Sequence, residues 1–191
     1  MPRVKKSPSP HIRESYSTKI RDYNGVGRWS VAEVQKRYLE HCKRLKIKNP
    51  QIPQPMETAE GDGHWIYPIM YAVIEGIKRG DKACLVLGIE FIEEDDFFVF
   101  GRILKANTAK ALRQAELTDD HIARVRKRIV EMLLAGNVPW EFREYAKLLR
   151  HIGIGDGRTQ IEEGLPAANP YVRRYINYLL TNQPLAPAIR T

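Results

Sequence analysis

The first residues to consider for chemistry form a run of carboxylates in the middle of the chain. They are Glu90, Glu93, Glu94, Asp95 and Asp96. Side chains three or four positions apart share a helix face, so Glu90 could hold a hard cation together with Glu93 or Glu94. A di-metal carboxylate bundle would add Glu-x-x-His pairs on facing helices, and the sequence contains none. We therefore favour a second interpretation, in which Asp95 or Asp96 caps a new helix and the acids face Arg102 and Lys105.

The remaining candidates for catalysis are weaker. The glycine-rich run 153–159 could bind an anion through its backbone N–H groups, but it lacks the Lys-Ser/Thr ending of a phosphate-binding loop. The five histidines are not spaced as zinc ligands, either with each other or with a cysteine. Cys42 and Cys84 occupy apolar positions of helical patterns, which predicts buried free thiols and a reducing, cytoplasmic setting. The sequence indicates no cofactor, and we favour a non-enzymatic protein.

Positive charge is concentrated in the first quarter of the chain. Residues 1–50 contain 13 Lys and Arg against 4 Asp and Glu, a net charge of +9. Residues 51–191 contain 18 against 19, a net charge of −1, so that the whole chain carries +8. A basic arm is a common electrostatic feature of nucleic-acid-binding proteins, although a solvated tail would have the same composition.

Basic helix faces supply the candidate binding residues. Ser30 and Glu33 form a capping box that starts an amphipathic helix, which Asn49-Pro50 ends. Residues 118–152 are similar to a helix-turn-helix, with a turn after Gly136 and a second helix from Pro139. The cations expected to contact phosphates, or else to form solvated faces, are Lys36, Arg37, Lys43, Arg44, Arg124, Lys127, Arg128, Arg143, Lys147 and Arg150.

The elements that must position these residues are all predicted to be helices. Residues 82–94 are apolar on nearly every side, which indicates a central core helix, with Gly80 ending the helix before it and Asp81 as its N-cap. Further helices are predicted at 68–79, 97–115, 118–135, 139–152 and 170–180. Residues 49–63 are expected to form a linker or surface loop, residues 153–169 a loop, and no segment is predicted to be a strand.

One pattern occurs twice. Residues 74–81 (IEGIKRGD) are similar to residues 130–137 (VEMLLAGN) at an offset of 56, and both are followed by an apolar helical pattern. The helix–glycine–helix unit over 66–152 resembles the helical hairpins of HEAT-like repeat proteins. This resemblance implies a short stack of hairpins, and a compact multi-helix bundle is the other all-α interpretation.

The sequence therefore predicts an all-α protein in three parts: a basic, largely disordered arm (1–28), a basic amphipathic helix with a Pro-rich linker (29–63), and a helical-hairpin domain (64–191). Our leading hypothesis is non-enzymatic binding of nucleic acid, DNA first, through the basic helix faces and the arm. A protein–protein interaction scaffold is the alternative, and a metal-dependent enzyme using residues 90–96 is the second alternative. No apolar run is long enough to span a membrane, and nothing indicates an oligomeric state.

Overall fold

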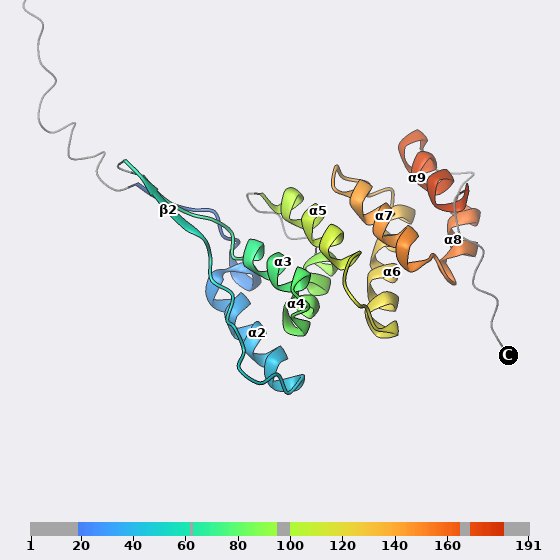
Figure 1. Ribbon diagram of the computed structural model, residues 1–191. Coiled ribbons are helices and arrows are strands. Elements are labelled where there is room, and N and C mark those ends of the chain that lie inside the picture. Colours follow the sequence, from blue (N-terminus) through green and yellow to red (C-terminus); the bar gives the residue numbers. More distant parts are fainter. Residues whose placement is uncertain (1–18, 62, 95–99, 165–168, 182–191) are drawn as a thin grey trace, which may run out of the picture.

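The computed structural model describes residues 19–61, 63–94, 100–164 and 169–181, and these residues are mostly helical (Figure 1). Within them lie eight α-helices, one 3₁₀ helix and a small three-stranded sheet. The predicted all-α, multi-helix fold class is confirmed.

The three strands were not predicted, so the expectation that no segment is a strand is wrong. β1 (Lys19–Asp22), β3 (Gly63–Ile66) and β2 (Glu57–Glu60) lie in that order, with β1 parallel and β2 antiparallel to β3. Each strand has only four residues. All four residues of β2 are exposed, so its sequence lacks the alternation of apolar and polar residues that usually indicates a strand. Figure 1 shows the sheet extending away from the helical body.

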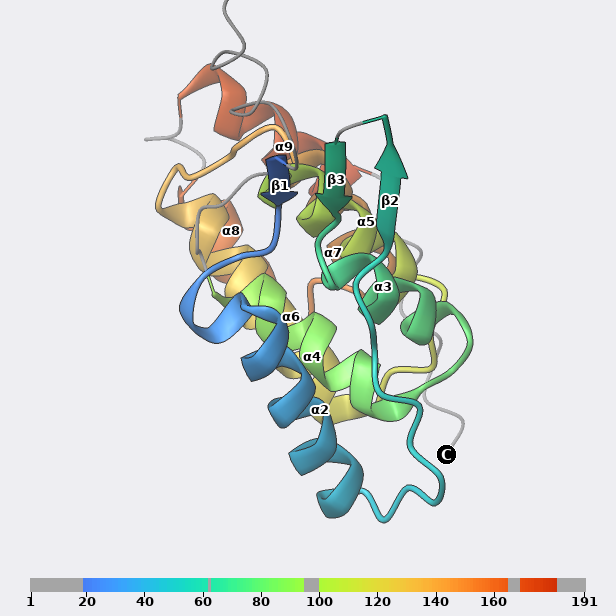
Figure 2. The same cartoon turned by 90° about the vertical axis from the view of Figure 1, so that its left-hand side faces the viewer.

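Helix α2 (Val31–Arg44) follows a short 3₁₀ helix, η1 (Gly27–Trp29). The Ser30 hydroxyl accepts a hydrogen bond from the Glu33 backbone N–H at 3.4 Å, which confirms the predicted helix start. Val34, Tyr38 and Cys42 form its buried face. This face lies along α4 (Lys82–Glu93), as Figure 2 shows.

The predicted central helix is confirmed as α4, in which nine of twelve residues are buried. α3 (Met70–Lys78) precedes it and ends at Gly80, whose φ of +83° favours glycine. Asp81 caps α4 by accepting hydrogen bonds from the Ala83 and Cys84 N–H groups at 2.8 and 3.0 Å. The Tyr38 hydroxyl of α2 donates to the same carboxylate at 2.8 Å, so one side chain joins α2 to the α3–α4 joint.

The second half of the chain adds α5 (Gly101–Leu112), α6 (Asp119–Leu134), α7 (Phe142–Ile152), α8 (Gly157–Gly164) and α9 (Pro170–Thr181). Helix α8 lies where a loop was expected, because it buries only Gly157 and Ile161 and so shows little apolar periodicity. Lys105 of α5, one of the two cations expected to face the acidic run, is buried. The turns at Gly136 and Gly153 have φ of +72° and +82°, as their positions after helices predicted.

The helices form an elongated body. Figure 1 places α2 at one end and α8 with α9 at the other. Helix α4 lies inside the first half, in contact with α2, α3, α5 and α6, whereas α9 packs against α6, α7 and α8. The surface around α2 and the surface around α9 therefore lie at opposite ends of the body.

The two roles of Asp81 lead to a testable prediction about stability. Asp81→Ala removes a helix cap and the acceptor of the Tyr38 hydroxyl, so the free energy of unfolding should fall by about 2–3 kcal/mol. Tyr38→Phe removes only the hydroxyl and should cost about 1 kcal/mol. Urea denaturation of both variants measures the difference, and equal losses would contradict the capping role of Asp81.

Candidate nucleic-acid interface

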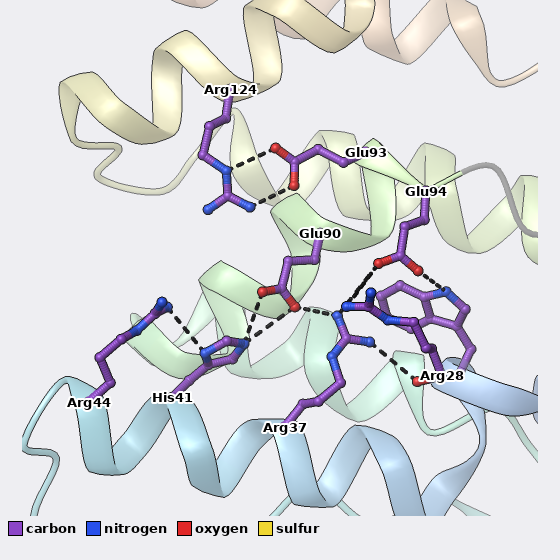
Figure 3. A network of polar contacts seen from close by, with 9 residues as sticks. Arg28, Arg37, His41, Arg44, Glu90, Glu93, Glu94 and Arg124 are labelled. Atoms are coloured by element: carbon purple, nitrogen blue, oxygen red, sulfur yellow. Dashed lines mark hydrogen bonds and ion pairs between the residues drawn. The ribbon is translucent and has the colours of Figure 1, made fainter.

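The predicted basic face of α2 divides into one buried and several exposed cations. Arg37 is buried, and its guanidinium forms an ion pair with Glu90 of α4 (Figure 3). It also lies 4.6 Å from the centroid of the Trp29 ring and donates to the Arg28 carbonyl oxygen at 3.3 Å. Because its charge is already paired inside the fold, Arg37 holds α2 against α4 and does not face a ligand. The exposed cations of this helix are Lys36, Lys43 and Arg44.

Each described carboxylate of the acidic run has a basic partner. Glu90 also contacts the His41 ring, at 3.2 Å, and Glu93 accepts hydrogen bonds of 2.8 and 2.6 Å from the Arg124 guanidinium of α6 (Figure 3). The partners of Glu94 are Arg28, at 3.1 Å, and the Trp29 indole N–H, at 3.0 Å. These partners come from α2, α6 and the segment before α2, not from Arg102 or Lys105. The predicted helix cap at Asp95 or Asp96 lies outside the described residues.

The electrostatics of this network are those of a structural site. Burial alone would raise the pKa of Glu90, but the hydrogen bond with His41 and the positive charge of Arg37 outweigh burial and hold the pKa at about 2. The hydrogen bonds with Glu93 raise the pKa of Arg124. A general acid or base works best with a pKa near the operating pH, which Glu90 does not have. In the described ranges, no three His, Cys, Asp or Glu side chains gather as metal ligands.

The predicted cations of α6 do not form one open surface. Arg124 is paired with Glu93, Arg128 is half-buried, and the exposed Lys127 ammonium lies 4.0 Å from Glu131. Arg126, which sequence reasoning did not select, donates to the Gly153 carbonyl oxygen at 2.9 Å and so closes the end of α7. The glycine-rich run 153–159 therefore begins at the C-terminal end of α7, where the Arg126 guanidinium already binds the backbone carbonyl oxygen of Gly153.

The predicted cations of α7 lie together beside α9. Arg143 and Lys147 line a groove of about 570 Å³ whose other lining residues are Ala146, Arg174, Tyr175 and Tyr178. The Arg150 guanidinium lies 5.0 Å from the centroid of the Tyr178 ring. A helix-turn-helix reads the major groove with a free helix face, and here α9 packs beside the basic face of α7. The side chains predicted for a recognition helix thus border a groove within the protein.

A second group of cations gathers where α2 ends. The chain turns back through Lys46 and Asn49, with φ of +55° and +57°, and this turn lies against the α3–α4 joint. Lys46, Arg79 and Lys82 line a shared groove of about 560 Å³, of which Asp81 is the one acidic lining residue. We define the basic end of α2 as six cations, none of which forms an ion pair with a described carboxylate: Lys43, Arg44, Lys46, Lys48, Arg79 and Lys82.

Sequence reasoning missed several members of these two surfaces. Arg79 and Lys82 flank Gly80, and only the packing of α2 on α4 shows that they lie beside Lys46. Arg174 had a detectable signal, because it shares a helical stripe with Tyr171, Tyr175 and Tyr178. The two thiols are free and buried as predicted, and burial raises the pKa of both Cys42 and Cys84, so neither is an activated nucleophile.

Comparisons of the chain with protein-family models, curated proteins and solved structures find no match. None of the helices in the described part of the chain has the length and apolar character needed to cross a membrane. The groove between α7 and α9 and the basic end of α2 are therefore the two surfaces of the protein considered for ligand binding.

Breaking the ion pair between α2 and α4 should destabilise the fold strongly. Glu90→Gln removes the main counter-charge of the buried Arg37 guanidinium and leaves only Glu94, at 3.9 Å, which should lower the free energy of unfolding by about 3 kcal/mol. Glu33→Gln removes the exposed pair with Lys36 and serves as the control, with an expected change below about 0.5 kcal/mol. If urea denaturation gives the two variants equal stability, the structural role of Glu90 is wrong.

The lowered pKa of Glu90 predicts how stability depends on pH. Folding lowers this pKa from 4.5 to about 2, a shift worth on the order of 3 kcal/mol. Because the folded-state pKa is the lower one, the stabilisation is complete above pH 4.5 and is lost as the pH falls towards 2. Unfolding free energies measured across this range should therefore fall more steeply for the wild type than for Glu90→Gln. If the unfolding free energies of the wild type and Glu90→Gln fall in parallel with pH, the lowered pKa of Glu90 is wrong.

Proposed function

We propose that this protein is a non-enzymatic nucleic-acid-binding protein that contacts phosphates through the basic end of α2. The observation that carries the proposal is the groove that Lys46, Arg79 and Lys82 line together, next to the exposed Lys43, Arg44 and Lys48 in the last turn of α2 and just after it. None of the six cations forms an ion pair with a described carboxylate. Clustered Lys and Arg side chains bind phosphate backbones because they replace condensed counterions, whose release favours binding.

Several other exposed cations of the protein, unlike those at the basic end of α2, are paired with a glutamate of their own helix. Lys36 pairs with Glu33, Lys78 with Glu75, Lys127 with Glu131 and Arg158 with Glu162. Such pairs within a helix neutralise the surface locally. The cations at the basic end of α2 form no such pairs, and three of them share one groove with a single acidic residue, so an excess of positive charge is left there for an anionic ligand.

The proposed contact is to the backbone and not to base edges. Lysine and arginine bound to phosphates position a nucleic acid without reading its sequence, so affinity should fall steeply with salt and vary little with sequence. The N-terminal arm forms part of the proposal, with DNA as the leading ligand. Its first 18 residues, which lie outside the described part, contain four Lys and Arg and one Glu.

A protein–protein interaction scaffold is the second candidate. The observation in its favour is Trp140, which is 69% exposed in the turn before α7. An exposed aromatic residue is a frequent anchor of protein interfaces. This candidate stands second because exposed apolar side chains that occur singly are normal for a protein surface.

Charge removal at the basic end of α2 tests the proposal. The triple variant Lys43→Gln, Lys46→Gln, Lys48→Gln should weaken binding to a labelled DNA duplex because three phosphate contacts are lost. We expect the slope of log K against log salt to become shallower by roughly 2–3 between about 50 and 200 mM salt. Fluorescence anisotropy across this salt series measures both affinity and slope.

The matched control is Arg102→Gln, Arg158→Gln, Lys110→Gln, which removes the same charge from exposed positions on α5 and α8. This control should retain most of the wild-type affinity and slope. If both triple variants lose binding equally, net charge and not the basic end of α2 drives the interaction. If the wild type binds neither duplex nor single-stranded DNA at low salt, the proposed function is wrong.

A further inference from the structure

Helix α9 has two faces of different chemistry. Val172, Ile176 and Leu179 are buried and attach the helix to the body. The second face carries a stripe with helical spacing: Tyr171, Arg174, Tyr175 and Tyr178. Tyr171 is 77% exposed, whereas Tyr175 and Tyr178 are half-buried and pack against the edge of the core, so each of these two rings keeps part of its surface exposed.

Helix α7 presents a matching stripe of cations. Arg143, Lys147 and Arg150 recur at intervals of four and three residues, while the core face of α7 is formed by Phe142, Tyr145, Leu148 and Leu149. The helices touch where the Tyr175 ring meets Phe142 edge to face, with ring centroids 4.9 Å apart. They touch again where the Arg150 guanidinium covers the Tyr178 ring. Figure 1 shows α7 and α9 as neighbours at the end of the body opposite α2.

The groove between these stripes combines positive charge with aromatic rings. Its lining includes Arg143, Lys147, Arg174, Tyr175 and Tyr178, and no lining residue is acidic. Glu144, next to the groove, is bound by Lys147 at 2.8 Å and by Arg113 at 3.5 Å. The guanidinium groups of Arg143 and Arg174 form no ion pair with any described carboxylate, so the groove keeps a positive charge.

This combination fits one class of ligand better than others. Single-stranded nucleic acids offer phosphates and unpaired base faces at the same time, and proteins bind them with basic grooves in which bases stack on aromatic or guanidinium planes. A duplex offers phosphates but keeps its base faces stacked inside. An acidic peptide would use the cations and leave the tyrosine rings without a partner.

We propose that the α7–α9 groove binds single-stranded nucleic acid, with phosphates on Arg143 and Arg174 and a base stacked on the aromatic and guanidinium surface of Tyr175, Tyr178 and Arg150. The inference rests on the proposed function and adds to it a second site and a strand preference. The basic end of α2 contacts phosphates of either form, and the groove favours single strands.

Paired variants separate stacking from charge. The probe is fluorescein-labelled oligothymidylate of about 12 nucleotides, a length within the usual site sizes of single-strand-binding folds. Tyr178→Leu keeps an apolar side chain but removes the ring, and it should weaken binding roughly tenfold without changing the salt slope. Tyr178→Phe keeps the ring and should bind like the wild type.

Two neighbouring arginines provide the matched charge comparison. Arg174→Gln should make the salt slope for the single strand shallower by about 0.7, because one phosphate contact is lost. Arg173→Gln removes the same charge from an exposed position on α9 that does not line the groove, and it should leave the slope unchanged. Circular dichroism melting of each variant checks that the fold is retained.

An abasic strand of the same length completes the experiment, because it keeps the phosphates and lacks the bases. We expect the wild type to bind it more weakly than oligothymidylate, and Tyr178→Leu to bind it as well as the wild type does. Equal loss on both strands would mean that Tyr178 acts through the fold, which would overturn the inference, as would full affinity of Tyr178→Leu for oligothymidylate.

The remaining outcomes distinguish this inference from the proposed function. If the wild type binds duplex and oligothymidylate equally and the groove variants have no effect, the proposed nucleic-acid binding stands. The assignment of a single-strand site to the α7–α9 groove is then wrong. Competition by polyglutamate at equal charge concentration, with the same loss in Tyr178→Leu, would assign the groove to an acidic peptide instead. A wild type that binds no nucleic acid overturns both.

Discussion

Helix α4 is buried over nine of its twelve residues, so the helices around it must accept nearly its whole surface. Its last turns carry Glu90 and Glu93, whose charges oppose the helix dipole and need counter-charges when they are partly buried. Arg37 supplies one from α2, and Arg124 supplies the other from α6. Neutralising the acids of α4 therefore also fixes the helices on two of its sides.

This requirement divides the basic residues of the protein into two kinds. Arg37 and Arg124 are bound to carboxylates between helices and contribute to the fold. The cations at the basic end of α2, and Arg143 and Arg174 in the α7–α9 groove, form no ion pair with a described carboxylate. A helical projection places Arg37 beside the buried stripe of Val34 and Tyr38, but it does not show which carboxylate pairs with the guanidinium. The identity of the ion-pair partner, which only tertiary packing reveals, makes the separation.

How far the sequence predicts this structure depends on the range of the interactions. Ser30 and Asp81 were identified as helix caps because capping is a contact within a few residues. Strand β1 was missed because its partner β3 is more than 40 residues away in sequence. Strands β2 and β3 pair locally, and they were missed because neither alternates between buried and exposed side chains. At the candidate site, Arg143 and Lys147 were selected from the spacing along one helix. Their partner Tyr178 was not, because its position depends on how α9 packs against α7.

The attachment of α9 has a consequence for dynamics. Among the described elements, α8 and α9 contact only α6, α7 and each other, and neither contacts α4. Local opening of this end leaves the central helix intact, so its free energy lies below that of global unfolding. Amide hydrogens of α9 should therefore exchange with solvent through local openings, whereas those of α4 exchange only when the whole fold opens. The α9 wall of the groove can thus move while α4 stays buried.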